Sequence, residues 1–175
     1  MRDDVLQRAA LVQLAVFDVD GVLTDGRLIL GDDGQEYKAF HSRDGHGLRM
    51  LQDSGITVAI ITGRTSHVVA KRTRELGIEH VYQGHRDKLP ALRELLDLLQ
   101  LPGDAAAYVG DDVVDLPVMR RVGLAVAVGD AHTYVKRHAH WVTDAHGGRG
   151  AAREVCELLM QAHGTLEARL RAYVE

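Results

Sequence analysis

The stretch Leu14-Ala-Val-Phe-Asp-Val-Asp-Gly-Val-Leu-Thr-Asp-Gly26 decides the fold, because a short apolar run here delivers two aspartates to one point. If a strand ends at Asp18, as Gly21 and the Asp25-Gly26 pair indicate, Asp18 and Asp20 both lie at its carboxyl end. Open α/β sheets bind their ligands at this edge. Two carboxylates about 4 Å apart repel one another by roughly 4 kcal/mol in a surface-like dielectric, and a divalent cation would reverse that repulsion. The stretch therefore predicts a magnesium site, with an ordinary acidic turn as the alternative.

Composition narrows the class of protein. The chain has 175 residues, 46% hydrophobic and 26% charged, which predicts one domain over residues 1–175. A net charge of -4 without a long basic run argues against nucleic-acid binding. The single cysteine, Cys156, cannot form an internal disulfide, and no basic-then-apolar leader precedes the first strand, so we expect a cytoplasmic location. Apolar runs such as residues 56–61 are too short to cross a membrane, so no membrane partner is expected.

Apolar runs without polar alternation predict strands that are buried on both faces. These runs cover residues 13–17, 56–61, 105–109 and 124–128, and shorter strands are expected near residues 81–83 and 141–142. Helical segments separate the strands, among them a leucine-rich helix over residues 89–99 and a long helix over residues 151–163. The alternation is typical of the α/β class, with a doubly wound parallel sheet.

Two peripheral segments carry expectations of their own. Residues 27–30 and 35–40 are β-prone and are joined by Gly31-Asp-Asp-Gly34, which predicts a small β-hairpin flap. A hairpin alone is marginal in water, so its apolar side chains need cover from the body of the domain or from another subunit. Residues 1–10 are polar and weakly helical, and we expect a loosely held lead-in.

Residues with distinct chemical uses follow several of the predicted strands, and the carboxyl ends of parallel strands meet at one edge. Carboxylates suit Mg²⁺, which prefers oxygen ligands, and hydroxyl, N–H and ammonium donors suit a phosphate group. Taken singly, each residue also fits a helix cap, a turn or a solvated helix start. Taken together, they predict a phosphoryl-transfer site. The set comprises Asp18, Asp20, Thr62, Gly63, Lys88, Asp111, Asp112 and Asp115.

In type, order and spacing, these residues resemble the four motifs of the haloacid dehalogenase-like hydrolases. The motifs are Asp18-Val-Asp-Gly-Val, Thr62-Gly-Arg64, Lys88 and Gly110-Asp-Asp-Val-Val-Asp115. The resemblance implies that Asp18 is the nucleophile, which forms an aspartyl-phosphate, and that Asp20 is the general acid and then the base for the attacking water. It also implies a set of binding residues. Mg²⁺ would be held by Asp18, the backbone carbonyl of Asp20 and Asp111, with Asp112 or Asp115 supporting, and the phosphoryl group by Thr62, Gly63 and Lys88.

The chain has no room for a large cap domain, because only the hairpin and one helix lie between the first two motifs. Within the superfamily, the closer resemblance is to the 3-deoxy-D-manno-octulosonate 8-phosphate phosphatases of bacterial lipopolysaccharide precursor synthesis. It is carried by Phe17 to Gly26, Phe40-His-Ser-Arg-Asp-Gly45, Ala59-Ile-Ile-Thr-Gly-Arg64, Tyr82-Gln-Gly84, Tyr108-Val-Gly-Asp-Asp112 and Gly147-Gly-Arg-Gly-Ala-Ala-Arg-Glu-Val-Cys156.

This resemblance implies an Mg²⁺-dependent phosphatase and a homotetramer in which the hairpins assemble at the centre and help to cover neighbouring active sites. It further implies that Arg64, Arg72 and Arg149 help to recognise an acidic sugar phosphate, since guanidinium groups suit carboxylate and phosphate. Arg72 and Arg149 also fit solvated surface positions.

Three other functions remain open at this point. A phosphatase for a nonulosonate 9-phosphate, such as a sialic-acid-like sugar, would keep the chemistry and change the substrate. A phosphoacceptor receiver domain also combines aspartates, threonine and lysine with Mg²⁺, but its acceptor lies on a middle strand, whereas the D-x-D-G motif here follows the first strand. The complete set of acids, threonine and lysine argues against a non-catalytic structural subunit.

Overall fold

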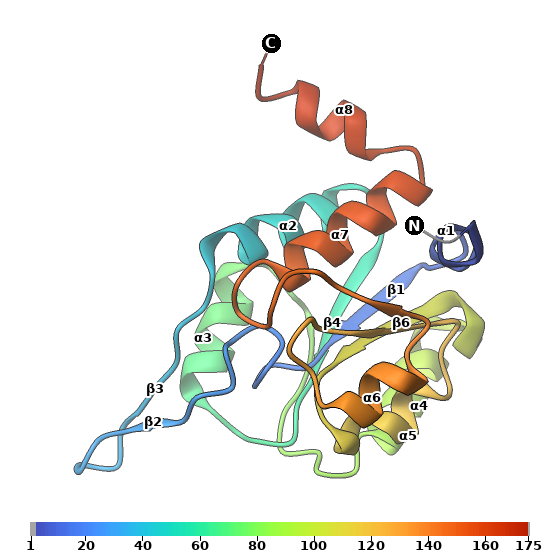
Figure 1. The fold of residues 1–175 in the computed structure, drawn as a ribbon. Coiled ribbons are helices and arrows are strands. Elements are labelled where there is room, and N and C mark those ends of the chain that lie inside the picture. The colour runs from blue at the N-terminus through green and yellow to red at the C-terminus, as the bar shows by residue number, and fades with distance from the viewer. Residues whose placement is uncertain (1–2, 175) are drawn as a thin grey trace.

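A sheet of six parallel strands forms the centre of the molecule in a computed structural model that describes residues 3–174 (Figure 1). The strand order is β5-β4-β1-β6-β7-β8, so the first strand lies in the middle between β4 and β6. The parallel pairing confirms the predicted α/β class. The bounds are β1 (Leu14–Phe17), β4 (Thr57–Ile61), β5 (His80–Tyr82), β6 (Ala106–Gly110), β7 (Leu124–Ala127) and β8 (Trp141–Val142).

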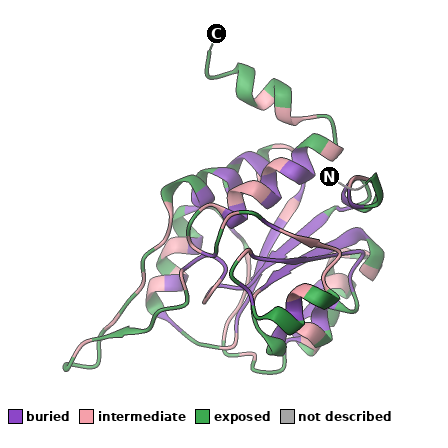
Figure 2. Cartoon of the chain, viewed as in Figure 1, coloured by how far each residue is buried: buried purple, intermediate pink, exposed green. Residues whose placement is uncertain are grey.

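Helices cover the sheet on both faces, which leaves its central strands buried (Figures 1 and 2). The helices α2 (Ser42–Asp53) and α7 (Ala151–Ala162) pack against one another on one face, and α4 (Leu89–Leu99) and α5 (Leu116–Met119) lie on the other. Every residue of β1, β6 and β7 is buried. Further helical segments are α3 (His67–Glu75), α6 (Thr133–His138), α8 (Leu166–Arg171) and the short 3-10 helices η1 (Gly103–Ala105) and η2 (Val113–Asp115).

The predicted hairpin is present as β2 (Ile29–Leu30) paired antiparallel with β3 (Glu36–Tyr37). It projects from the body of the molecule, and its strands are shorter than the predicted runs (Figure 1). The side chains of Leu28, Ile29, Leu30 and Tyr37 are exposed. The body of the protein therefore does not supply the cover that these apolar side chains need, and no cap domain is evident among the described residues.

The N-terminal segment is held more firmly than the sequence predicts. Residues 3–9 form α1 (Asp3–Ala9), in which Val5 and Ala9 are buried, and Arg8 Nη1 donates a hydrogen bond of 2.8 Å to the carbonyl of Gly123. The expectation of a loosely held lead-in is wrong for these residues because the buried pair at i, i+4 spacing forms an apolar face on one side of the helix. Residues 1 and 2 of that lead-in lie outside the described residues.

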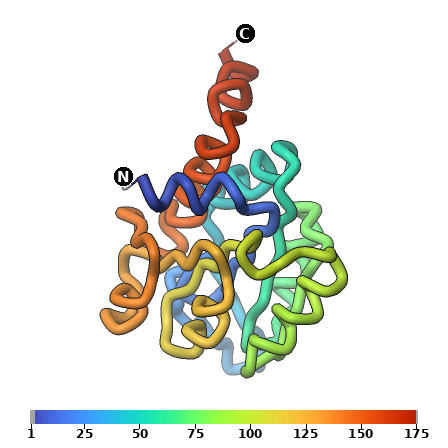
Figure 3. The backbone as a smooth tube through the Cα atoms, turned by 90° about the vertical axis from the view of Figure 1, so that its right-hand side faces the viewer, coloured from blue at the N-terminus to red at the C-terminus, as the bar shows by residue number. Residues whose placement is uncertain are grey.

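The C-terminal helix α8 extends away from the sheet, on the side of the molecule where α1 lies (Figure 3). None of its residues is buried. Among residues 3–174, no helix is long and apolar enough to cross a membrane.

Candidate active site

The end of β1 delivers Asp18 into a buried position. The Asp18 N–H donates to the carbonyl of Val109 on β6 at 3.1 Å, which extends the sheet pairing to this residue. The N–H of Val19 then donates to Asp18 Oδ1 at 2.7 Å, and the side chain is only 8% exposed. The other carboxylate oxygen, Oδ2, lies 2.7 Å from Lys88 Nζ at the start of α4. One carboxylate oxygen is thus fixed by the backbone and the other faces a buried cation.

Beneath Asp18, a buried polar network centres on Asp115. Its Oδ1 lies 2.6 Å from Lys88 Nζ and accepts a hydrogen bond of 2.8 Å from the hydroxyl of Tyr108. Its Oδ2 accepts from the N–H groups of Asp111 at 3.0 Å and Asp112 at 3.2 Å. Asp115 is fully buried, and these four donors satisfy its carboxylate. The sequence did not single out Tyr108, although a tyrosine in an apolar strand needs a hydrogen-bond partner when buried.

Three of the acids can share a cation. Asp18, Asp111 and Asp115 each offer a carboxylate oxygen, and these oxygens all lie within 4.8 Å of one another. Burial, followed by the charges of Asp115 and Asp18, raises the pKa of Asp111 to about 8. Burial and the charge of Asp115 raise the pKa of Asp18 to about 6, although Lys88 opposes the shift. Such mutual repulsion between oxygen ligands fits a hard divalent cation such as Mg²⁺.

Asp18 and Asp111 suit direct contact with such a cation better than Asp115, whose four hydrogen bonds occupy it. Among the described residues, the Asp111 carboxylate accepts no hydrogen bond. Gly21 allows the turn after β1 to lie close to Asp111, because a Cβ at this position would collide with the Asp111 carboxylate. The backbone φ of Gly21 is also +90°, where glycine is favoured.

An open pocket lies above these acids and gathers most of the predicted site. It is lined by Asp18, Asp20, Thr62, Gly63, Arg64, Lys88, Asp111 and Asp112, and also by Gly26, Leu28, Arg86 and Val114. Thr62 is buried directly after β4, where its N–H donates to the Tyr82 carbonyl at 2.9 Å. Donors for a phosphate and acids for a cation therefore face one space. Arg86, an exposed arginine in that lining, was not singled out from the sequence.

Two of the predicted substrate-binding arginines lie elsewhere in this chain. Arg72 lines a separate small pocket between α2 and α3, where its Nη1 lies 3.5 Å from Glu75 Oε2. Arg149 is exposed on the loop before α7, and its Nη2 lies 3.8 Å from Asp25 Oδ2. Their contact with a substrate stays a prediction.

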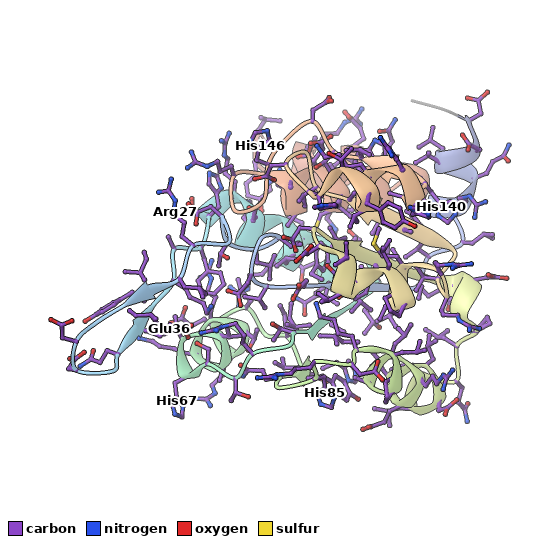
Figure 4. The ribbon with its side chains drawn as sticks, turned by 60° about the horizontal axis from the view of Figure 1, so that its bottom comes forward. Arg27, Glu36, His67, His85, His140 and His146 are labelled. Atoms are coloured by element: carbon purple, nitrogen blue, oxygen red, sulfur yellow. The ribbon has the colours of Figure 1, made fainter. Side chains whose placement is uncertain are left out.

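Asp20 belongs to an outer cluster of charges that the sequence did not reveal. Lys38, directly after β3, pairs with Asp20 Oδ1 and lies 3.3 Å from Glu36 Oε1. Arg64 lies 2.8 Å from Glu36 Oε1 and 3.7 Å from Asp20 Oδ2. Burial would raise the pKa of Glu36, but hydrogen bonds and the positive charge nearby prevail and lower it to about 2. Glu36 lies where the hairpin meets the body of the molecule (Figure 4).

Two further sequence blocks support the site from behind. The Asp44 carboxylate, on α2, accepts hydrogen bonds from the N–H groups of Gly150 at 3.2 Å and Arg153 at 2.9 Å at the start of α7. The loop before α7 packs onto the turn that follows β1, and the Gly148 N–H donates to the Val22 carbonyl at 2.8 Å. These contacts hold the turn that presents Asp18 and Asp20.

Comparison with known proteins places the chain in a family. It is 53% identical to the 3-deoxy-D-manno-octulosonate 8-phosphate phosphatase KdsC of Yersinia pestis over 165 residues, which cover 94% of this chain and 88% of the relative. A family model for haloacid dehalogenase-like hydrolases also matches residues 78–155. The chain belongs to the haloacid dehalogenase-like hydrolases. The resemblance read from the four motifs is therefore confirmed.

Solved structures of related hydrolases have nearly the same fold. A probable YrbI family phosphatase from Pseudomonas syringae pv. phaseolica is 54% identical, with a TM-score of 0.98 over 99% of both chains. A 3-deoxy-D-manno-octulosonate 8-phosphate phosphatase from Moraxella catarrhalis, solved with magnesium ion, phosphate ion and KDO, is 40% identical, with a TM-score of 0.97 over 99% of both chains. This haloacid dehalogenase-like hydrolase thus has the same fold as a protein that holds a metal and a phosphate.

Proposed function

We propose that this chain is an Mg²⁺-dependent phosphatase that hydrolyses 3-deoxy-D-manno-octulosonate 8-phosphate to 3-deoxy-D-manno-octulosonate and phosphate. The observation that carries the proposal is the buried contact between Asp18 and Lys88, beside Thr62 and Asp111, at one edge of the sheet. The likeness to phosphatases of this substrate, which extends over nearly the whole chain, supports the choice of sugar.

In the first step, the Asp18 carboxylate attacks phosphorus, and the sugar oxygen leaves with a proton from Asp20. The product on the enzyme is an aspartyl-phosphate. In the second step, Asp20 takes a proton from water, which attacks phosphorus, releases phosphate and restores Asp18. A carboxylate nucleophile divides one difficult displacement into two easier ones, and a group with a labile proton can serve as acid and then as base. Lys88 and Thr62 would bind the phosphoryl oxygens, with the Gly63 N–H beside them.

Charge explains the rest of the site. Mg²⁺, when held by Asp18, Asp111 and the backbone carbonyl of Asp20, supplies positive charge that offsets the repulsion between the nucleophile and the phosphate. Asp115 supports this arrangement by orienting Lys88 and the backbone of Asp111, and Asp112 follows at the rim of the pocket.

We also propose that the chain acts as one domain in a cytoplasmic homotetramer. The exposed apolar side chains of the hairpin support the assembly, because burying them against other subunits would remove them from water. The one cysteine, Cys156, is buried and unpaired, in keeping with a reducing compartment. Arg64 lines the pocket, which supports a role for it in contacting an acidic sugar. Arg72 and Arg149 would depend on neighbouring subunits or on movement to reach the sugar.

The test is phosphate release with Mg²⁺ from a panel of sugar-acid phosphates that includes the eight-carbon substrate and a nonulosonate 9-phosphate. We expect preference for the eight-carbon substrate, and loss of turnover in Asp18→Asn with an unchanged circular dichroism spectrum. Asp97→Asn, an exposed position on α4, is the matched control. Preference for the nine-carbon substrate would instead identify the chain as a nonulosonate 9-phosphate phosphatase. A long-lived aspartyl-phosphate without turnover would indicate a receiver-type role, and full activity of Asp18→Asn would overturn the nucleophile assignment.

A further inference from the structure

The outer charge cluster points to a function for the base of the hairpin. We propose that Lys38 is a positioning residue that orients Asp20 for proton transfer to the leaving oxygen. This inference rests on the proposed phosphatase chemistry and adds a residue to it. Lys38 does not line the pocket around Asp18, so it acts through Asp20 rather than on the substrate.

The burial of Lys38 shows that its position is specific. Its side chain is only 1% exposed, although lysine ordinarily keeps its ammonium group in water. A buried ammonium group needs partners, and Lys38 has two: Asp20 Oδ1 and, at 3.3 Å, Glu36 Oε1. Removal of one member of such a group leaves the others uncompensated, so the three side chains hold one another in place.

The contact leaves half of the Asp20 carboxylate available. Lys38 donates to Oδ1, whereas Oδ2 has its nearest cation, Arg64 Nε, at 3.7 Å. That separation is too long for a hydrogen bond, and no other described residue donates to Oδ2. One oxygen is therefore anchored while the other can exchange a proton. Restricting the rotation of a catalytic acid in this way contributes to rate because less orientation must be gained at the moment of reaction.

Three separate parts of the fold meet at this point. Asp20 comes from the turn after β1, Lys38 follows directly after β3, and Arg64 comes from the loop after β4. Glu36 joins the last two, since its Oε1 contacts both Lys38 and Arg64. The hairpin therefore does more than present an apolar surface: its base reaches into the catalytic edge of its own chain.

Leaving-group dependence tests the proposal. The constant to compare is kcat/KM, because it reports the reaction from free enzyme and substrate up to the departure of the leaving group, which is the step that Asp20 assists. The sugar phosphate has a poor leaving oxygen that needs a proton, whereas p-nitrophenyl phosphate has a good one that does not. We expect Lys38→Met to lower kcat/KM for the sugar phosphate about 10- to 100-fold, because losing the orientation of Asp20 forfeits part of the roughly 10²–10⁴ that a positioned acid contributes. For the aryl phosphate we expect a loss of less than about threefold. Lys38→Arg should restore part of the loss, and the exposed Lys71→Met is the matched control.

A double-mutant cycle with Asp20→Asn completes the test, because a residue that acts through Asp20 has nothing left to orient in that background. Lys38→Met should then cause no further loss. An equal loss on both phosphates, or additive effects in the double variant, overturns the proposal. If the eight-carbon sugar phosphate is not hydrolysed but another alkyl phosphate is, the proposed substrate fails, and the same comparison with that alkyl phosphate still decides the role of Lys38.

Discussion

Removing the charge of Asp111 should stabilise the metal-free protein and abolish its response to Mg²⁺. Asp111→Asn keeps the size of the side chain, and among the described residues the native carboxylate accepts no hydrogen bond that the amide would lose. The variant thus isolates one property, the negative charge of Asp111, which is unfavourable first because of its burial and then because of the charges of Asp115 and Asp18.

The magnitude follows from the pKa of Asp111, which rises from 3.8 to about 8. Each pKa unit corresponds to about 1.4 kcal/mol, which bounds the cost of the charged group at about 6 kcal/mol. The side chain is partly exposed, and screening by water reduces this to about 2 to 3 kcal/mol. For a protein of this size, such a gain raises Tm by about 5 to 10 °C.

The direction of the pKa shift of Asp111 also determines how stability depends on pH. The folded protein keeps the Asp111 proton to higher pH than the unfolded chain does, so stability falls as the pH rises from about 4 to about 8. Asp111→Asn escapes this fall. The two proteins should melt at similar temperatures near pH 4 and diverge by about pH 8.

The assay is thermal melting in chelator and in Mg²⁺ across that pH range. At about pH 8, wild type should gain stability from Mg²⁺ and Asp111→Asn should not. Asp97→Asn on the exposed face of α4 should behave as wild type. A variant that melts below wild type in chelator near pH 8, or that still responds to Mg²⁺, would refute the assignment of Asp111 as a charged cation ligand.

Three further predictions concern Gly21, Asp44 and the pH dependence of Mg²⁺ binding. Gly21→Ala should weaken Mg²⁺ binding, measured by calorimetry, at least about tenfold, because the added Cβ meets the Asp111 carboxylate. Gly34→Ala is the control and should leave binding unchanged, because Gly34 also has a positive φ but a Cβ there would meet no heavy atom within 4 Å. Asp44→Ala should lower the free energy of unfolding in urea by about 2 to 3 kcal/mol, because two N–H groups at the start of α7 lose their acceptor, whereas the exposed Asp53→Ala should change it by less than about 0.5 kcal/mol. Mg²⁺ affinity should fall as the pH drops below about 8, since protons compete for Asp111, and calorimetry in two buffers should detect proton release on binding.

The residues around Asp18, which form the inner site, could be predicted because they follow strands of one parallel sheet. Apolar runs locate the strands, and a parallel sheet must bring their carboxyl ends together. Asp18, Thr62 and Asp111 therefore converge whatever the details of packing. Lys88 could not be placed by this argument alone, since it begins a helix rather than ending a strand. Its assignment came from the resemblance to the third motif of the family.

The outer cluster could not be predicted because it depends on how a hairpin folds back. Lys38 and Asp20 are 18 positions apart, on either side of the hairpin, and no local periodicity encodes how the hairpin is placed against the turn after β1. The placement of Arg72 depends in the same way on the packing of α2 against α3. The docking of α1 is different, because the apolar residues Val5 and Ala9 at i, i+4 spacing carried a readable signal.

The two clusters differ in charge balance, and the difference assigns them different tasks. In the outer cluster, Asp20 and Glu36 face Lys38 and Arg64, so the charges compensate and the geometry is set before any ligand binds.

In the inner cluster, the three carboxylates of Asp18, Asp111 and Asp115 face one ammonium group, that of Lys88. Two negative charges remain when all three acids are ionised, which is the charge that one Mg²⁺ neutralises. Asp20, the proton carrier, therefore lies in a cluster without net charge, whereas Asp18, the nucleophile, lies in a cluster with excess negative charge. Binding of the cation relieves that repulsion, so part of the free energy lost in folding the acids together returns as affinity for the metal. The pKa values of Asp18 and Asp111 are raised in keeping with this, first by their burial and then by the charge of Asp115.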